Sequence, residues 1–249
     1  LPSYFPLPGF GIVPINAFVL QAAEPVLVDT GITLLNEGFL PQLASVIDPQ
    51  DLRWLWLTHD DQDHIGSLHQ LLDELPGLRV ITTYLGVGKL SLFRPLPLER
   101  VYLLNPGQSL SMGDRILTAV RPPTYDAPET TGFFDTKSGV FFSADSFGAL
   151  VSEPADNAAD IEPGKLREGL ITWATIDSPW LQSVDPAKFM DSLNVVRKMA
   201  PQVILSSHLP VAQGMNDTLL DYLAHALTAH PFVGPDQPAL EATLRQLAG

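Results

Sequence analysis

Residues 54–64 read WLWLTHDDQDH, and this stretch decides how the chain folds. The four apolar residues 54–57 predict a short buried strand. The seven residues 58–64 follow it directly and hold two imidazoles and three carboxylates. Because His is the commonest transition-metal ligand, a strand that ends in this cluster predicts a metal site. The alternative interpretation is a charged, solvated turn.

The spacing within the cluster favours the metal site. His59, Asp61 and Asp63 are two residues apart, so an extended chain projects them to one side, while His64 turns toward a neighbouring position. One short loop can therefore serve two adjacent metal ions. Two of the six His residues of the chain fall inside this loop, which a solvated turn does not explain.

Composition limits the classes of function. The 249 residues are 45% hydrophobic, enough for a sizeable core. Asp and Glu outnumber Lys and Arg by 28 to 14, and the net charge of -14 repels nucleic acid and anionic membranes. The chain has no Cys, which excludes disulfides, thiolate zinc sites, iron–sulfur clusters and a Cys nucleophile within these residues.

No targeting segment is evident in the sequence. No apolar run approaches the roughly 20 residues that span a bilayer. Residues 1–6 lack the basic and apolar regions of a signal peptide, although a cleaved signal stays open. An acidic chain of this kind is expected to be cytoplasmic.

The pattern of strands and helices predicts one α/β domain over residues 1–249. Acidic or His residues recur where strands end, at Asp29, in the 58–64 loop, at Asp145 and at His208. We expect them to meet at one edge of a layered sheet. Expected strands are 15–21, 25–28, 53–58, 78–82, 100–104, 116–120, 140–144 and 203–207; expected helices are 34–47, 65–75, 186–199, 217–229 and 238–247, with a surface loop containing some helix over 151–170.

Several motifs together resemble the metallo-β-lactamase superfamily. They are Asn-Ala-Phe at 16–18, Val-Leu-Val-Asp-Thr-Gly at 26–31, the 58–66 segment, Ser-Ala-Asp at 143–145 and Ser-His at 207–208. The match covers nearly the whole chain in order. It implies an αββα sandwich, two mixed sheets flanked by helices, with a dinuclear metal site at one edge.

One difference from the usual superfamily motif indicates which branch the chain resembles. Hydrolytic zinc members usually have His where this chain has Asp61. An acidic residue there resembles the diiron branch, the flavodiiron proteins and related oxygen-binding diiron proteins. By this resemblance one metal would bind His59 and Asp61, the other would bind Asp63, His64 and His208, and Asp145 would bridge both.

The remaining ligand of the first metal departs from the same pattern. The diiron branch has a His some way before the bridging Asp, and here Asp126 lies in that place, 19 residues before Asp145. Tyr125 is the other candidate, and an ordinary turn aspartate is the simpler role for Asp126. Asp29 is expected to hold a ligating imidazole by its free N–H rather than to bind metal.

Two functions from different classes follow. Because four carboxylates favour harder metals than zinc, iron is expected first, with manganese or zinc as alternatives. A diiron protein would bind, sense or reduce dioxygen or nitric oxide, and turnover would make it an oxidoreductase with a separate electron-donor protein. The alternative is a hydrolase of lactone, ester, thioester or phosphoester bonds, in which Asp63 positions a bridging hydroxide. A second copy of the chain is a further candidate partner.

Overall fold

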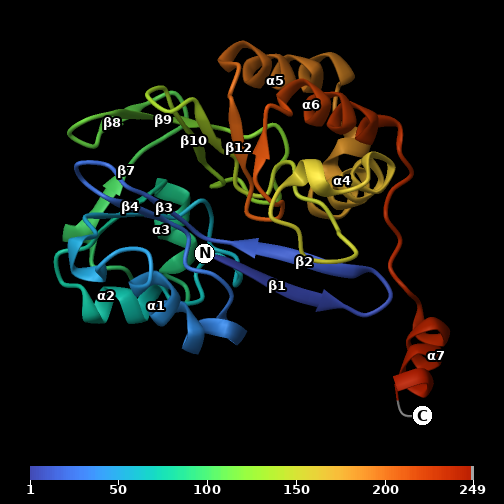
Figure 1. Cartoon of the computed structure of the whole chain (residues 1–249), viewed down its shortest axis with the longest axis horizontal. Coiled ribbons are helices and arrows are strands. Elements are labelled where there is room, and N and C mark those ends of the chain that lie inside the picture. The colour runs from blue at the N-terminus through green and yellow to red at the C-terminus, as the bar shows by residue number, and fades with distance from the viewer. Residues whose placement is uncertain (248–249) are drawn as a thin grey trace.

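Two sheets lie face to face, and helices cover both outer faces (Figure 1). The computed structural model describes residues 1–247. The five-stranded sheet is parallel except at its first strand, with the order β3 (Phe18–Leu20), β4 (Val26–Val28), β5 (Trp54–Trp56), β6 (Arg79–Thr82) and β7 (Val101–Leu103). The six-stranded sheet is mixed, with the order β13 (Ala212–Gln213), β12 (Val203–Leu205), β11 (Val140–Phe142), β10 (Gly132–Asp135), β9 (Ile116–Val120) and β8 (Ser109–Ser111).

Three hydrophobic clusters separate the four layers. In β5, Leu55 packs toward the outer helices, while Trp54 and Trp56 pack between the sheets, as side chains of a strand must alternate. The outer face of the five-stranded sheet is covered by α1 (Asn36–Ala44), α2 (Leu68–Glu74) and α3 (Tyr84–Leu90). The six-stranded sheet is covered by α4 (Pro163–Asp177), α5 (Pro186–Met199) and α6 (Asn216–Ala224). The expected αββα sandwich is confirmed.

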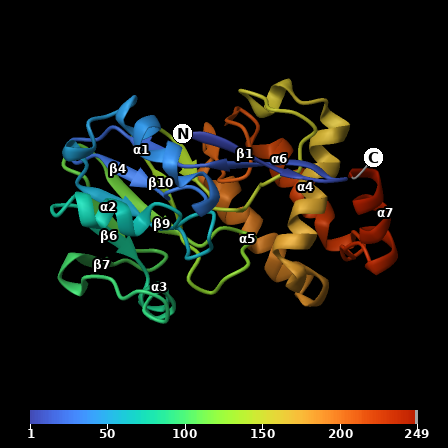
Figure 2. The ribbon, with the colours of Figure 1, turned by 90° about the horizontal axis from the view of Figure 1, so that it is seen from below.

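Some expected elements differ from the structure. The N-terminal residues form a hairpin of β1 (Pro2–Leu7) and β2 (Gly11–Asn16), which is not among the expected strands. Figure 2 shows β1 running from the five-stranded half toward α4. The expected strand 15–21 is divided between this hairpin and β3. Proline at positions 2, 6 and 14 hides the hairpin, because proline is unfavourable in most strands.

The second half contains more regular structure than expected. Helix α4 begins at Pro163, inside the segment expected to be mostly loop, and continues to Asp177. Strands β8, β10 and β13 and helix α3 are also absent from the expected set. The last helix, α7 (Gln237–Leu247), agrees with the expected range and stands apart at the end of a long connection (Figure 1).

The sheets bring the strand ends together. Parallel strands β4 and β5 end next to each other before Asp29 and the 58–64 loop. Parallel strands β11 and β12 end before Asp145 and His208 in the same way. Ligands gather at such carboxyl ends in α/β proteins.

Candidate metal centre

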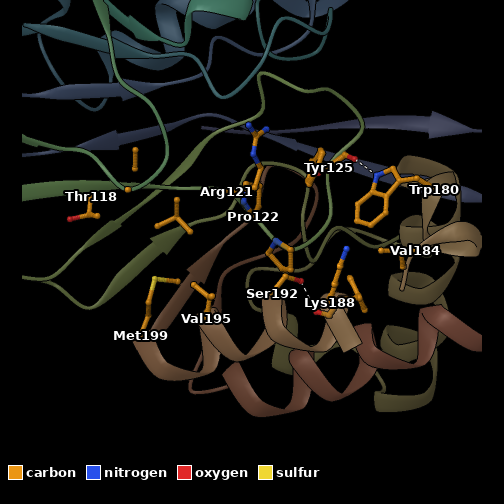
Figure 3. A pocket seen from close by; sticks show the side chains of 15 residues that line it. Thr118, Arg121, Pro122, Tyr125, Trp180, Val184, Lys188, Ser192, Val195 and Met199 are labelled. Carbon is orange, nitrogen blue, oxygen red and sulfur yellow. Dashed lines mark hydrogen bonds between the residues drawn. The ribbon is translucent and has the colours of Figure 1, made fainter. Parts of the chain in front are cut away.

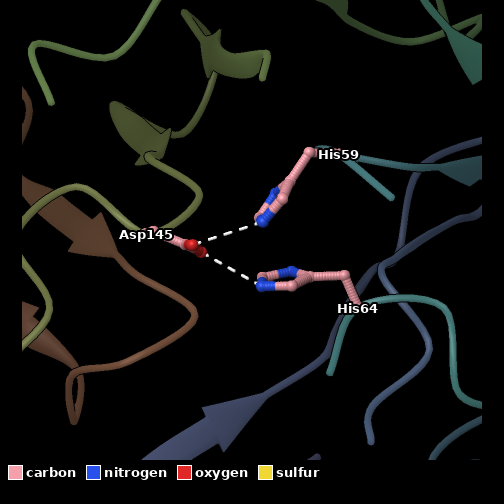
Figure 4. A group of neighbouring side chains, drawn as sticks. All are labelled: His59, His64 and Asp145. Atoms are coloured by element: carbon pink, nitrogen blue, oxygen red, sulfur yellow. Dashed lines mark ion pairs between the residues drawn. The ribbon is translucent and has the colours of Figure 1, made fainter. Parts of the chain in front are cut away.

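Asp145 lies at the centre of the candidate site. Its Oδ2 is 3.3 Å from His59 Nε2. Its Oδ1 is 3.1 Å from His64 Nε2 and 3.2 Å from His208 Nε2. Figure 4 shows the imidazoles of His59 and His64 converging on its carboxylate from the opposite loop. A carboxylate in reach of three imidazole nitrogens is the arrangement expected of a bridging ligand.

The other candidate ligands form two groups around Asp145. The first group is His59, Asp61 and Asp126, and the second is Asp63, His64 and His208. Within each group the ligand atoms lie within 4.8 Å of one another. In the second group, the Asp63 carboxylate is 3.8 Å from His64 Nε2 and 3.5 Å from His208 Nε2. All seven candidate metal ligands from the sequence therefore lie close together, and that they bind metal stays a prediction.

Tyr125, the alternative to Asp126, points elsewhere. Its ring packs on the ring of Trp180, with the two centroids 5.1 Å apart. The guanidinium of Arg121 lies over the Tyr125 ring, with Cζ 5.0 Å from the ring centroid. The Trp180 Nε1–H donates to the Tyr125 carbonyl over 2.7 Å. Tyr125 thus lines a cavity beside the candidate centre, whereas Asp126 lies with His59 and Asp61.

Each imidazole has its far nitrogen occupied, which leaves Nε2 facing the cluster. His64 Nδ1 lies 2.8 Å from Asp29 Oδ2, and His208 Nδ1 lies 2.8 Å from the Pro14 carbonyl. His59 Nδ1 is 3.1 Å from Thr58 Oγ1. Partners of this kind fix the tautomer and orientation of a metal-binding imidazole.

Asp29 holds the ligand loop through several contacts. Its Oδ1 accepts a hydrogen bond from the Thr58 N–H over 2.8 Å, and its Oδ2 accepts one from Thr58 Oγ1 over 2.8 Å.

The backbone around the site is also constrained. Gly66 packs directly on the backbone of residues 31–33, where a Cβ would clash. Asp29 and Ala144 have left-handed backbone conformations, with φ of 57° and 52°. Non-glycine residues rarely adopt these values, and they concentrate at functional sites.

A second polar cluster, outside the candidate metal site, connects the loop of His59 and Asp61 with the loop of Asp126. Asp60, which turns away from the metal side, accepts from Lys89 Nζ over 2.6 Å. Lys89 also pairs with the buried carboxylate of Glu129, three residues after Asp126. The lysine therefore connects the loop of His59 and Asp61 with the loop of Asp126.

Unpartnered atoms and charges both fit metal ions in this cluster. His59 Nε2, His64 Nε2 and Asp145 Oδ1 are buried, and none of them has a hydrogen-bond partner within the part of the chain that the structure describes. Burial and His64 act to lower the pKa of His59, but Asp145 and Asp126 outweigh them and raise it to about 9. Burial opposes ionisation of Asp145, yet the three surrounding imidazoles hold its pKa well below its ordinary value. Buried polar atoms left without partners are costly, and divalent cations would satisfy these.

Sequence reasoning missed one acidic residue of the site, Asp177. It forms a further group with Asp126 and Asp145, whose ligand atoms also lie within 4.8 Å of one another. No motif marks it, because it ends a helix rather than a strand. Trp173, on the same helix, donates from Nε1 to the Asp145 carbonyl over 3.1 Å, and its ring centroid is 4.4 Å from that of His208.

A cavity of about 530 Å³ lies beside the loop that carries Asp126. Figure 3 shows it between strand β9 and helix α5, with the Tyr125 and Trp180 side chains at one end. It is lined mainly by apolar side chains, and Arg121 and Lys188 are its charged residues. None of the candidate ligands lines it.

Comparison with known proteins identifies relatives over most of the chain. A family model described as ODP family beta lactamase matches residues 13–208. The diflavin flavoprotein A 1 of Synechocystis is 28% identical over 188 residues, which are 74% of this chain and 32% of that protein. The anaerobic nitric oxide reductase flavorubredoxin of Aeromonas hydrophila is 25% identical over 134 residues, 53% of this chain and 27% of that protein.

Solved structures share the fold. The rubredoxin oxygen:oxidoreductase of Desulfovibrio gigas superposes with a TM-score of 0.77 at 23% identity, over 90% of this chain and 56% of that one. The flavodiiron protein of Giardia intestinalis gives a TM-score of 0.76 at 16% identity, over 86% and 52%. The chain thus spans only part of the length of each of these proteins. Among the described residues, no helix has the length and apolar character needed to cross a membrane.

Proposed function

Because the chain belongs to the ODP beta lactamase family, we propose that its central cluster binds two metal ions, iron first, and that the centre binds or reduces dioxygen or nitric oxide. The observation that carries this proposal is the carboxylate of Asp145 within 3.3 Å of three imidazole nitrogens, His59, His64 and His208. The names of the relatives, an oxygen:oxidoreductase and a nitric oxide reductase, support the two small molecules.

The side chains present suit this chemistry. Asp61 and Asp126 give the first metal oxygen donors where zinc hydrolases use imidazole, and oxygen donors favour iron or manganese over zinc. Asp145 would hold both ions at a fixed separation, and Asp29 and the Pro14 carbonyl would keep two imidazoles in place. Two ferrous ions, when bound, would supply the electrons and the binding position for the diatomic molecule.

Sustained reduction needs electrons from outside these residues. The sequence has no Cys for a rubredoxin-type iron and no Gly-rich dinucleotide motif. The relatives carry flavin or rubredoxin in their names and extend well beyond the matched region. We propose that a separate redox protein or module supplies the electrons, and that the matched residues supply the metal centre.

The test combines metal content with gas consumption. The metal-free protein is loaded anaerobically with ferrous iron and mixed with dioxygen or nitric oxide while the gas and the visible spectrum are recorded. We expect two irons per chain and a gas-dependent spectral change that is lost in Asp145→Asn. Exposed Asp191→Asn on α5 is the matched control. Two tightly bound zincs, an unchanged spectrum and hydrolysis of a lactone or ester would instead support the hydrolase.

A further inference from the structure

Asp177 lies at the metal centre although it belongs to none of the strand-end motifs. It is the last residue of α4, and its carboxylate groups with those of Asp126 and Asp145. Asp126 belongs to the first metal position, whereas the second position draws on Asp63, His64 and His208. Asp177 therefore lies on the side of the first metal.

Packing fixes Asp177 in this place. Leu170 and Ala174 of the same helix are buried in the core against the six-stranded sheet. One turn before Asp177, the Trp173 indole donates to the Asp145 carbonyl. The Ser178 hydroxyl donates to Asp177 Oδ2 over 3.0 Å. The end of α4 is thus attached to the loop of the bridging residue, and Asp177 faces that loop as a consequence of the fold.

The charges at the centre point to a cation beside Asp177. With Asp177, five carboxylates surround the three imidazoles, namely those of Asp61, Asp63, Asp126, Asp145 and Asp177. Among the described residues, no Lys or Arg lies within 4.0 Å of any of these carboxylates. Carboxylates crowded together in this way are unfavourable unless a cation lies between them.

We infer that Asp177 is a ligand of the first metal, so that the two positions differ in kind and select different ions. This rests on the proposed dinuclear function. The first position would have one imidazole, from His59, with up to four carboxylates, from Asp61, Asp126, Asp177 and the shared Asp145. The second would have two imidazoles and two carboxylates. Oxygen-rich positions favour manganese or trivalent iron, and imidazole-rich positions favour zinc or ferrous iron.

The five carboxylates also set the charge of the loaded centre. Two divalent ions leave one negative charge uncompensated, whereas one divalent and one trivalent ion neutralise all five. The first position is therefore expected to hold the more highly charged ion when the two ions differ.

The test uses the metal-free full chain with Mn²⁺ and Zn²⁺ as probes. Because zinc binds most sites of nitrogen and oxygen donors more tightly than manganese, manganese is added in increasing excess over zinc and unbound ions are removed. Both bound metals are quantified by elemental analysis, and bound manganese also by its electron paramagnetic resonance. We expect a range of ratios in which wild type holds one manganese and one zinc. Asp177→Asn keeps the size of the side chain but removes its charge, and we expect manganese binding at least about tenfold weaker with one zinc retained. Asp191→Asn should behave as wild type.

The outcomes separate the inference from the proposed function. Wild type that binds two ions without preference, or Asp177→Asn that binds manganese as wild type does, overturns the role of Asp177 and leaves the dinuclear centre standing. Wild type that does not bind two ions of any kind overturns the dinuclear centre itself. If Asp177→Asn folds poorly, Asp177→Ser removes the same carboxylate, and manganese bound by either folded variant as by wild type overturns the role of Asp177.

Discussion

The two candidate metal positions hold their ligand side chains in different ways. One position is formed by Asp63, His64 and His208, and the other by His59, Asp61 and Asp126. In the former, both imidazoles are 1% exposed and each has its Nδ1 at 2.8 Å from a buried acceptor. In the latter, the carboxylates of Asp61 and Asp126 belong to exposed residues. We call the former the rigid position, because buried acceptors hold both of its imidazoles, and the latter the open position, because two of its carboxylates belong to exposed residues. A small molecule would reach the open position more readily, so we expect that position to exchange ligands.

The largest effect should come from removing what the two positions share. Asp145→Ala is expected to lose both ions, because Asp145 is the one candidate ligand in contact with all three imidazoles. Metal analysis after anaerobic loading measures this, with Asp191→Asn as control. One ion retained at full occupancy would show that Asp145 is not a bridge.

Removing one ligand from each position should separate them. His208→Ala is expected to lose the ion of the rigid position, because it removes a buried imidazole and leaves a cavity against Trp173. Asp126→Ala is expected to weaken the open position by more than about a hundredfold while the other ion stays, because even the outer partners of a ligand contribute about tenfold to a hundredfold. Stepwise metal titration of both variants checks this. Equal losses in the two variants would contradict the proposed difference.

Loosening the support of the rigid position should have a smaller effect. Asp29→Asn leaves one acceptor oxygen where two now serve His64 and Thr58. We expect about tenfold to a hundredfold weaker binding at that position, since partners of metal-bound His contribute this much. Exposed Asp51→Asn is a suitable control. An equal change at the open position would mean that Asp29 acts on the fold rather than on His64.

The smallest effect is a pH dependence confined to the metal-free protein. The pKa of His59 is raised from 6.5 to about 9, so the stability it contributes is complete below pH 6.5 and is lost as pH rises through 9. The pKa of Asp177, raised from 3.8 to about 8, acts in the same direction. Denaturant unfolding from pH 6.5 to 9 should show falling stability without metal. Bound metal, which requires deprotonated ligands, should remove or reverse this slope.

The two halves of the site also differ in how far the sequence predicts them. His59, Asp61, Asp63 and His64 are contiguous and follow an apolar strand, so local pattern alone identifies them. Asp145 and His208 also follow buried strands, and resemblance gave them their roles. Whether Tyr125 or Asp126 faces the metals could not be decided, because neighbouring residues of an irregular loop have no fixed periodicity.

Other features depend on tertiary packing. Asp177 reaches the site because α4 packs on the six-stranded sheet, and neither its neighbours nor its spacing marks it. The β1–β2 hairpin was missed for a local reason, its prolines, yet it supplies the Pro14 carbonyl that orients His208. The pattern of strands and helices predicted only an α/β domain, and the αββα architecture was implied by the resemblance, through the order of the motifs.

The placement of Trp173 gives this protein an optical reporter. Its indole ring stacks near the His208 imidazole and is hydrogen-bonded to the backbone of Asp145. Trp54 and Trp56 lie between the sheets and Trp180 packs on Tyr125, so the ring of Trp173 is the one against a candidate ligand. A paramagnetic ion beside His208 would quench the emission of Trp173, and diamagnetic zinc would not. Comparison of the emission of wild type and Trp173→Phe should therefore show whether a paramagnetic or a diamagnetic ion has bound.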